Sequence, residues 1–139
     1  MSQASADLLL RGYRAFVAGD LAALEGMLDP GVEWVAVGEE AVVVSRDRVL
    51  EVLAERVAEG YHVTVDRAIG LPDRVVVSMR FSRSEVDPTD ERPLQSRRSY
   101  LLGRWAGLVH IRGGHVVRVE EYPHLEAALE AAGIEDDHA

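Results

Sequence analysis

The sequence contains no cysteine, no lysine and no asparagine among its 139 residues. The absence of cysteine excludes disulfide bonds, thiolate nucleophiles, zinc–sulfur sites and iron–sulfur clusters. The absence of lysine excludes a Schiff base on the chain and the lysine of a P-loop, and the absence of asparagine excludes N-glycosylation. The apolar stretch near the start, Leu8 to Leu10, is interrupted by Arg11. We therefore expect no signal peptide and no membrane span, and a cytoplasmic protein.

Acidic residues outnumber basic ones by 24 to 15, which gives a formal net charge of −9. This balance argues against nucleic acid or an anionic membrane surface as the main partner. The five histidines are isolated and show neither HxH nor HExxH spacing, so we predict no metal site. The length fits one domain, and we predict that residues 1–139 form it.

Apolar residues recur with helical spacing in the first part of the chain, and the period changes to two after residue 60. The pattern predicts helices over 4–17, 21–28, 46–59 and 125–132, with Asp20 and Ser45 as N-caps of the second and third. It predicts strands over 32–37, 61–71, 74–83, 101–111 and 115–122, with Gly113-Gly114 as a hairpin turn. The polar segment 84–98 contains Pro88 and Pro93, and we predict a mobile loop at the mouth of the fold.

Helices dominate the first part of the chain and strands the second, which favours an α+β fold. Because both parts have only one apolar side, we expect the helices to cover one face of a curved antiparallel sheet. Alternation places Val63, Val65 and Ile69 on one face of their strand. It places His115, Val117, Val119 and Glu121 on one face of the last strand, unless a bulge intervenes.

Several segments resemble those of SnoaL-like proteins, which belong to the nuclear transport factor 2-like superfamily. The resemblance is carried by Tyr13-Arg-Ala-Phe16, Gly19-Asp-Leu21, Leu28-Asp-Pro-Gly-Val-Glu-Trp34, Ser45-Arg-Asp-Arg-Val49, Ile111-Arg-Gly-Gly114, Val116-Val-Arg-Val-Glu-Glu-Tyr122 and Leu125-Glu-Ala-Ala-Leu129. It implies a cone-shaped barrel with a pocket between the helices and the sheet. It also implies isomerases, polyketide cyclases, epoxide hydrolases, dehydratases and non-catalytic binders as functions, and fold alone does not choose among them.

The resemblance transfers site residues only in part. Glu121 resembles the carboxylate of the cyclase branch, whose histidine partner falls near Gly107 here and is absent. No aspartate follows Arg80 or Arg104 as the epoxide hydrolase pattern requires. The aspartate, tyrosine and protonated aspartate of the ketosteroid isomerase branch find no matching set.

Glu121 is the leading catalytic candidate. On a valine-rich face its carboxylate would be desolvated, which raises the pKa of a carboxyl group and suits a general base or acid. The alternative is that the strand has ended by Glu121 and the side chain is solvated at the rim.

The remaining candidates divide into polar and apolar groups. Arg67, Arg80, Arg104 and His110 are candidates for stabilising an enolate, and the alternative for the last three is a homodimer interface on the outside of the sheet. The candidate ligand-binding residues, whose alternative is plain core packing, are Tyr13, Phe16, Trp34, Leu53, Val57, Met79 and Tyr122.

Three functions stay open at this point. The first is a cofactor-free isomerase, cyclase or dehydratase that moves a proton on a small apolar carbonyl compound. The second is a module that binds or senses a small apolar ligand without turnover. The third is a dimerisation domain. An enclosed cavity with a desolvated carboxylate favours the enzyme, and a purely apolar cavity favours the binder.

Overall fold

The computed structural model describes residues 3–36, 41–84, 89, 91–92 and 99–134. The helices in this part of the chain are α1 (Gln3–Ala18), α2 (Leu21–Met27), α3 (Arg46–Ala58) and α4 (Leu125–Ala132). The strands are β1 (Leu28–Ala36), β2 (Ala41–Val44), β3 (Tyr61–Gly70), β4 (Arg74–Ser84), β5 (Ser99–Arg112) and β6 (His115–Tyr122).

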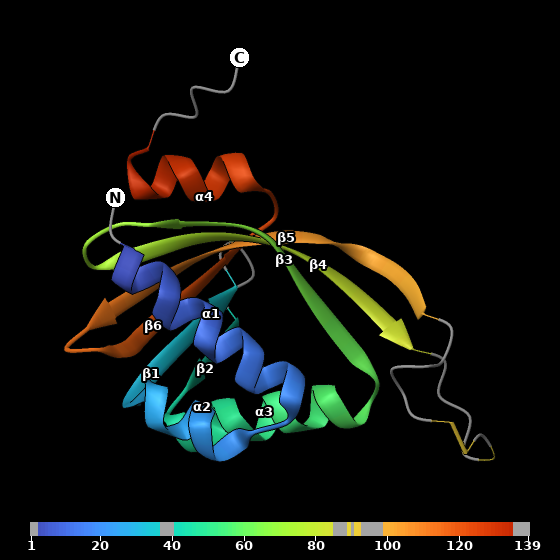
Figure 1. Cartoon of the computed structure of the whole chain (residues 1–139). Coiled ribbons are helices and arrows are strands. Elements are labelled where there is room, and N and C mark those ends of the chain that lie inside the picture. Colours follow the sequence, from blue (N-terminus) through green and yellow to red (C-terminus); the bar gives the residue numbers. More distant parts are fainter. Residues whose placement is uncertain (1–2, 37–40, 85–88, 90, 93–98, 135–139) are drawn as a thin grey trace.

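The six strands form one curved sheet in the order β2-β1-β6-β5-β4-β3. The pairing of β1 with β6 is parallel, and every other pairing is antiparallel. Helices α1, α2 and α3 lie against the concave face, and α4 lies on the opposite, outer face (Figure 1). The expected α+β class, with N-terminal helices on a curved sheet, is therefore confirmed.

The helix ends follow the capping residues of the sequence. The side chain of Asp20 accepts a hydrogen bond from the backbone N–H of Ala23, and that of Ser45 accepts one from Arg48. Gly133 ends α4 with a φ of 73°, a left-handed conformation that favours glycine. These caps set where the helices begin and end.

The sheet is buried on both faces where α4 covers it. Val75 and Val77 belong to the concave core with Val32, Val49 and Val109, whereas Val76 belongs to an outer core. The outer core joins Ala106 and Leu108 of β5 to Ala128, Leu129 and Ala132 of α4. The N-terminal helices cover one face as expected, and the apolar side of α4 covers part of the other face.

Irregular registers change which residues share a face. The β3–β4 register shifts between Val65 and Arg67, and an extra residue in one strand reverses the alternation beyond it. Ile69 therefore packs in the outer core, and the expectation that it shares a face with Val63 and Val65 is wrong. A second shift, at Val117 of β6, turns Val116 into the concave core together with Val119, so the expected alternation from His115 through Val117 to Val119 is wrong.

Some segments differ from those expected. The first strand begins at Leu28 rather than Val32, and β2 pairs with it although no strand was predicted there. The predicted loop over 84–98 lies outside the described residues, apart from Ser84 in β4 and Thr89, Glu91 and Arg92.

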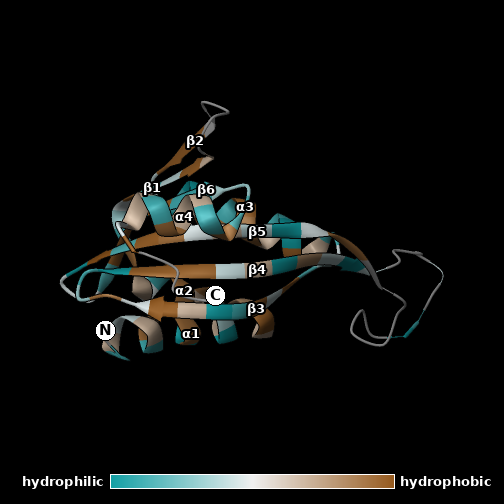
Figure 2. Cartoon of the chain, turned by 90° about the horizontal axis from the view of Figure 1, so that it is seen from above, coloured by the Kyte–Doolittle hydropathy of each residue, from teal (hydrophilic) through white to brown (hydrophobic). Residues whose placement is uncertain are grey.

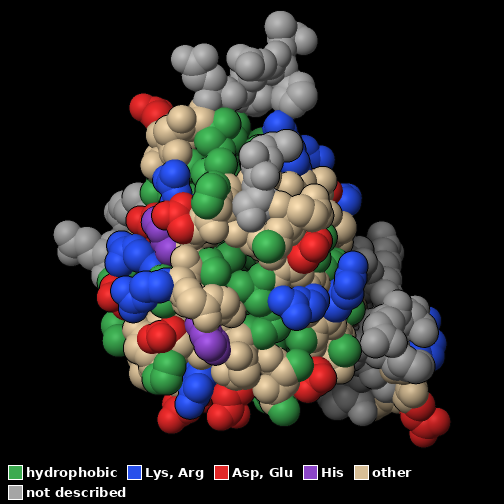
Figure 3. All heavy atoms as spheres, turned by 60° about the vertical axis from the view of Figure 1, so that its left-hand side comes forward, with side chains coloured by type: hydrophobic (Ala, Val, Ile, Leu, Met, Phe, Trp, Pro, Cys, Tyr) green, Lys and Arg blue, Asp and Glu red, His purple; other side chains and the backbone are tan. Residues whose placement is uncertain are grey.

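Hydropathy follows this arrangement. Figure 2 shows hydrophobic residues on the strands near α4 and hydrophilic residues along the part of β4 that extends beyond it. On the side of the molecule that carries the β5–β6 turn, hydrophobic side chains reach the surface between groups of arginine and acidic residues (Figure 3). No helix in the described ranges is both long enough and apolar enough to cross a membrane.

Candidate functional site

Glu121 lies on the concave face of the sheet, near the end of β6. The register places it opposite Gly107 of β5 on one side and Ala36 of β1 on the other. It shares this face with Val119, which is in the concave core. The side chain is partly buried. The strand therefore continues past Glu121, which places the carboxylate among apolar neighbours.

Trp34 holds the carboxylate of Glu121. The indole Nε1–H of Trp34 on β1 donates a hydrogen bond to Oε1 of Glu121, with a nitrogen–oxygen distance of 2.5 Å. An indole N–H can only donate, so the carboxylate must be the acceptor. A hydrogen bond to an ionised acceptor is stronger than one to a neutral acceptor. The contact therefore fixes the position of this carboxylate oxygen.

Trp105 of β5 covers the position next to Glu121. Its ring stacks on Phe81 with centroids 5.2 Å apart and an angle of 21° between the planes. A Cβ atom at Gly107 would lie 2.9 Å from Cζ3 of Trp105, so the ring lies directly over that glycine. The space beside Glu121 that a side chain at Gly107 would fill is thus bounded by an aromatic surface.

Trp105 is the residue that the sequence predictions missed. It alternates with Gly103 and Gly107 on one face of β5, and the register with Phe81 and Met79 confirms that this is the concave face. A large ring between two glycines on one side of a strand is a usable signal, because aromatic rings cover neighbouring glycines in sheets.

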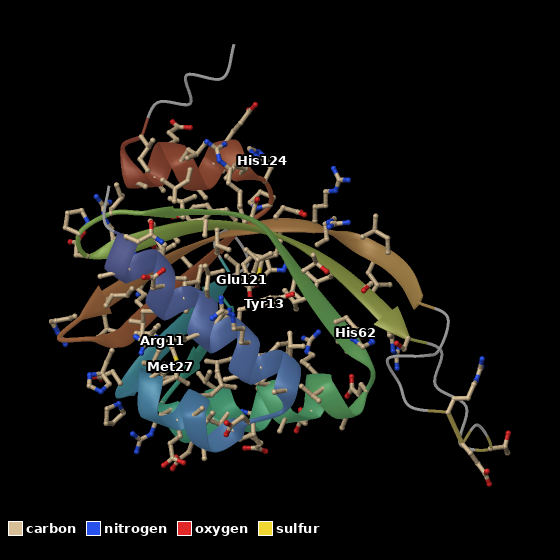
Figure 4. The ribbon with its side chains drawn as sticks, viewed as in Figure 1. Arg11, Tyr13, Met27, His62, Glu121 and His124 are labelled. Atoms are coloured by element: carbon tan, nitrogen blue, oxygen red, sulfur yellow. The ribbon has the colours of Figure 1, made fainter. Side chains whose placement is uncertain are left out.

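The predicted ligand-binding residues lie on the concave face of the sheet and on the helices opposite it, apart from Tyr122. Met79 and Trp34 are on the concave face of the sheet, and Leu53 of α3 packs against the same core. Tyr13 and Phe16 come from α1 and Val57 from α3, and all three are partly buried. Figure 4 shows Tyr13 and Glu121 in the middle of the molecule, between the sheet and the helices. Trp34, Met79 and Glu121 are each partly exposed.

The polar partners predicted for Glu121 lie on the other face. Arg80 is directly opposite Arg104, His110 is opposite Arg118, and Arg67 is opposite Ser78. These positions alternate with Val75, Val77, Met79 and Val109, which face the helices. A pocket role for Arg67, Arg80, Arg104 or His110 beside Glu121 is therefore wrong, because strand alternation turns them to the outside.

Tyr122 also faces outward. It lies opposite Ala106 and packs against the outer core, under α4. Its placement in the ligand pocket is therefore wrong. Burial raises the pKa of the Tyr122 hydroxyl, Glu120 raises it further by charge repulsion, and Arg118 lowers it.

A charge network connects three strands on the outer face. Nε2 of His110 lies 2.6 Å from Oε1 of Glu120, and Nε of Arg118 lies 3.5 Å from the other oxygen of Glu120. Arg118 also donates to Glu33 at 3.0 Å. These contacts give His110 a structural partner on its own face.

One further feature lies away from the concave face. A surface hollow of about 450 Å³ is lined by Ala4, Asp7, Leu10, Arg11 and Arg14, all from α1 and mostly on its exposed side. In the ranges that the structure describes, no three His, Asp or Glu side chains gather in a group that could hold a metal ion.

The comparison with protein families matches a model described as a SnoaL-like domain to residues 9–119. The chain belongs to the SnoaL-like domain family. A search of curated protein sequences gives no significant match. Among solved structures, this SnoaL-like protein is similar to Bal32a from a soil-derived mobile gene cassette, at 18% identity and a TM-score of 0.68, with 86% of this chain and 88% of that chain covered.

Two other similar structures contain small organic molecules. One is TerC co-crystallised with polyporic acid, at 20% identity and a TM-score of 0.66, covering 92% of this chain and 97% of that one. The other is a protein of ketosteroid isomerase-like fold from Catenulispora acidiphila in complex with trimethylamine, at 19% identity and a TM-score of 0.63, covering 95% and 96%. At these identities the likeness shows the fold of the SnoaL-like protein, which is the nuclear transport factor 2-like cone.

Proposed function

We propose that this SnoaL-like protein binds a small, largely apolar carbonyl compound between the concave face and helices α1 and α3, and moves a proton on it without a cofactor. The observation that carries the proposal is the partly exposed Glu121 carboxylate, held by Trp34 on the same face as the apolar concave core. Isomerisation, cyclisation and dehydration all need such a base. The small molecules in the similar structures are consistent with a ligand in this fold.

In the proposed reaction Glu121 takes a proton from the carbon next to the carbonyl group. The C–H bond breaks, an O–H bond forms on Glu121, and the electron pair moves onto the carbonyl oxygen. Returning the proton to another atom of the same molecule completes an isomerisation. Trp34 contributes by keeping the carboxylate in one orientation, which removes the entropy of aligning it.

The outward placement of the arginines and His110 changes how the enolate would be stabilised. A donor for the developing negative charge has to come from the concave side, and the candidate there is Tyr13 of α1. A neutral hydroxyl or N–H placed in a low-dielectric site can stabilise such a charge.

Glu121→Gln tests the proposal, because it keeps the volume and the hydrogen bond from Trp34 but removes the base. Hydrogen–deuterium exchange in D₂O, measured over a panel of β,γ-unsaturated ketones and 1,3-diketones, identifies a substrate. With that substrate we expect a rate loss of about 10²–10⁴-fold, the usual contribution of general acid–base catalysis.

Glu130→Gln is the matched control, since Glu130 is exposed on α4. It should leave the exchange rate unchanged. An exchange rate that survives Glu121→Gln in a folded variant would exclude Glu121 as the base.

A non-catalytic binding module is the second candidate. It is favoured by the placement of Arg67, Arg80, Arg104 and His110, since none of these expected partners shares the face of Glu121. This function predicts saturable ligand binding with no exchange above the uncatalysed rate for any compound of the panel.

A further inference from the structure

Trp105 carries a hydrogen-bond donor without an acceptor. Its indole Nε1–H is buried and has no hydrogen-bond partner among the described residues. Buried indole N–H groups usually find a partner, and one that is left over in a native protein calls for an explanation such as a bound molecule. The other tryptophan of the chain, Trp34, has its partner in Glu121.

Trp105 lies on the same face of the sheet as Glu121, on the neighbouring strand. Gly107 is directly opposite Glu121, and Trp105 is two residues along the same strand, which makes it a diagonal neighbour of Glu121. The ring turns its Cζ3 edge toward Gly107, so the N–H lies on the opposite edge of the indole, away from the glycine that faces Glu121.

The surroundings of Trp105 favour a flat ligand. Phe81 stacks on its ring, and the ring as a whole keeps partial exposure although its N–H is covered. An acceptor therefore reaches the N–H by displacing a neighbouring side chain. Met79 lies opposite Trp105 on β4, and an unbranched methionine adapts to such a change at little cost.

We propose that the Trp105 indole N–H donates a hydrogen bond to the oxygen of a planar, neutral ligand, and so determines which molecules the concave face accepts. This inference rests on the proposed function for the location of the ligand, but not for turnover.

The probe is 2-naphthol, a planar apolar molecule with one oxygen that can accept a hydrogen bond, and naphthalene is its counterpart without the oxygen. The chain has two tryptophans, so a ¹⁵N–¹H spectrum shows two indole signals, and the signal lost in Trp105→Phe is that of Trp105. We expect 2-naphthol to shift the Trp105 signal downfield and naphthalene not to do so.

Trp105→Phe keeps an aromatic ring against Phe81 but removes the donor. We expect its affinity for 2-naphthol to fall roughly tenfold, the effect of a lost hydrogen bond, with its affinity for naphthalene unchanged. Phe81→Leu is the control. It should lower the affinity for both ligands equally because it removes only stacking.

Equal losses for both ligands in Trp105→Phe would overturn the proposal, and so would an unshifted Trp105 signal. Failure of 2-naphthol to bind at millimolar concentration would overturn the proposal that the ligand is planar and neutral. Because these readouts measure binding, they are separate from the exchange assay: Glu121→Gln should still bind 2-naphthol even where proton transfer is lost.

Discussion

The missing side chain of Gly107 lets the Trp105 ring lie flat over β5 beside Glu121. A methyl group there would meet Cζ3 of Trp105 at 2.9 Å and Cγ1 of Val77 at 3.2 Å. We expect Gly107→Ala to displace the ring and to lower the free energy of unfolding by about 1–3 kcal/mol, as overpacking does. Denaturant unfolding followed by tryptophan fluorescence measures both effects.

Gly103→Ala provides the matched comparison for that substitution. Gly103 lies on the same face of β5, and a Cβ atom there would meet nothing within 4 Å. Its stability should stay close to that of the wild type. Equal stability of the two alanine variants would contradict the close packing of Trp105 over Gly107.

Glu121 and Trp34 could be predicted from the sequence because strand alternation and a likeness of motifs pointed to them. Their mutual hydrogen bond could not, since it joins residues 87 positions apart. The partners proposed for Glu121 failed for a simpler reason. Alternation showed that Arg80, Arg104 and His110 share a face, but it could not say whether that face was the inside or the outside.

Secondary structure was predictable wherever capping residues and periodicity agreed, as in α3 with its Ser45 cap. The register shifts at Val65–Arg67 and His110–Ile111 were not predictable, because a bulge requires no particular residue at the positions involved. The short strand β2 was missed since Ala41–Val44 has no alternation, and its partner β1 supplies the reason for it to extend.

Tyr122 packs against the outer core that holds α4, and the pKa of its hydroxyl is raised above the ordinary value of 10.0, mainly by burial. The unfolded chain therefore loses this proton first as the pH rises. The stability associated with neutral Tyr122 is complete below pH 10 and is lost as the pH rises through the folded-state pKa. We predict that Tyr122→Phe removes this part of the decrease in stability at alkaline pH, as measured by urea unfolding.

The control for Tyr122→Phe is the wild-type protein. The free energy of unfolding of both proteins is measured at pH values below and above the ordinary tyrosine pKa. The two proteins should differ in the slope of stability against pH above that value and not below it. Identical alkaline slopes would show that Tyr122 titrates as in the unfolded chain.

The molecule leaves part of its outer face uncovered beyond α4, where Arg104 lies directly opposite Arg80. Arg80 pairs with Asp66 at 2.8 Å, whereas Arg104 is exposed and has no ion pair in the described part of the chain. Like charges opposite each other on a sheet are unfavourable, and a carboxylate from a second copy would relieve them. We predict a homodimer through this surface at micromolar concentration, measured by sedimentation.

Arg104→Glu should weaken that dimer without lowering the stability of the monomer, because it removes the repulsion from Arg80. Arg14→Glu, on the exposed side of α1, is the control and should leave the dimer intact. A wild-type protein that sediments as a monomer would remove this prediction.

The parallel pairing of β1 with β6 has a consequence for how the chain reaches its folded state. Among the described strands, β1 and β2 join the rest of the sheet only through β6, which follows the other five along the chain. Closing so long a loop is entropically unfavourable, and folds rich in such contacts form more slowly than those built from local ones. The pairing of β1 therefore cannot form until β6 is available. The contact between Trp34 and Glu121 depends on that final pairing, so the candidate site is assembled at the end of folding rather than at its beginning.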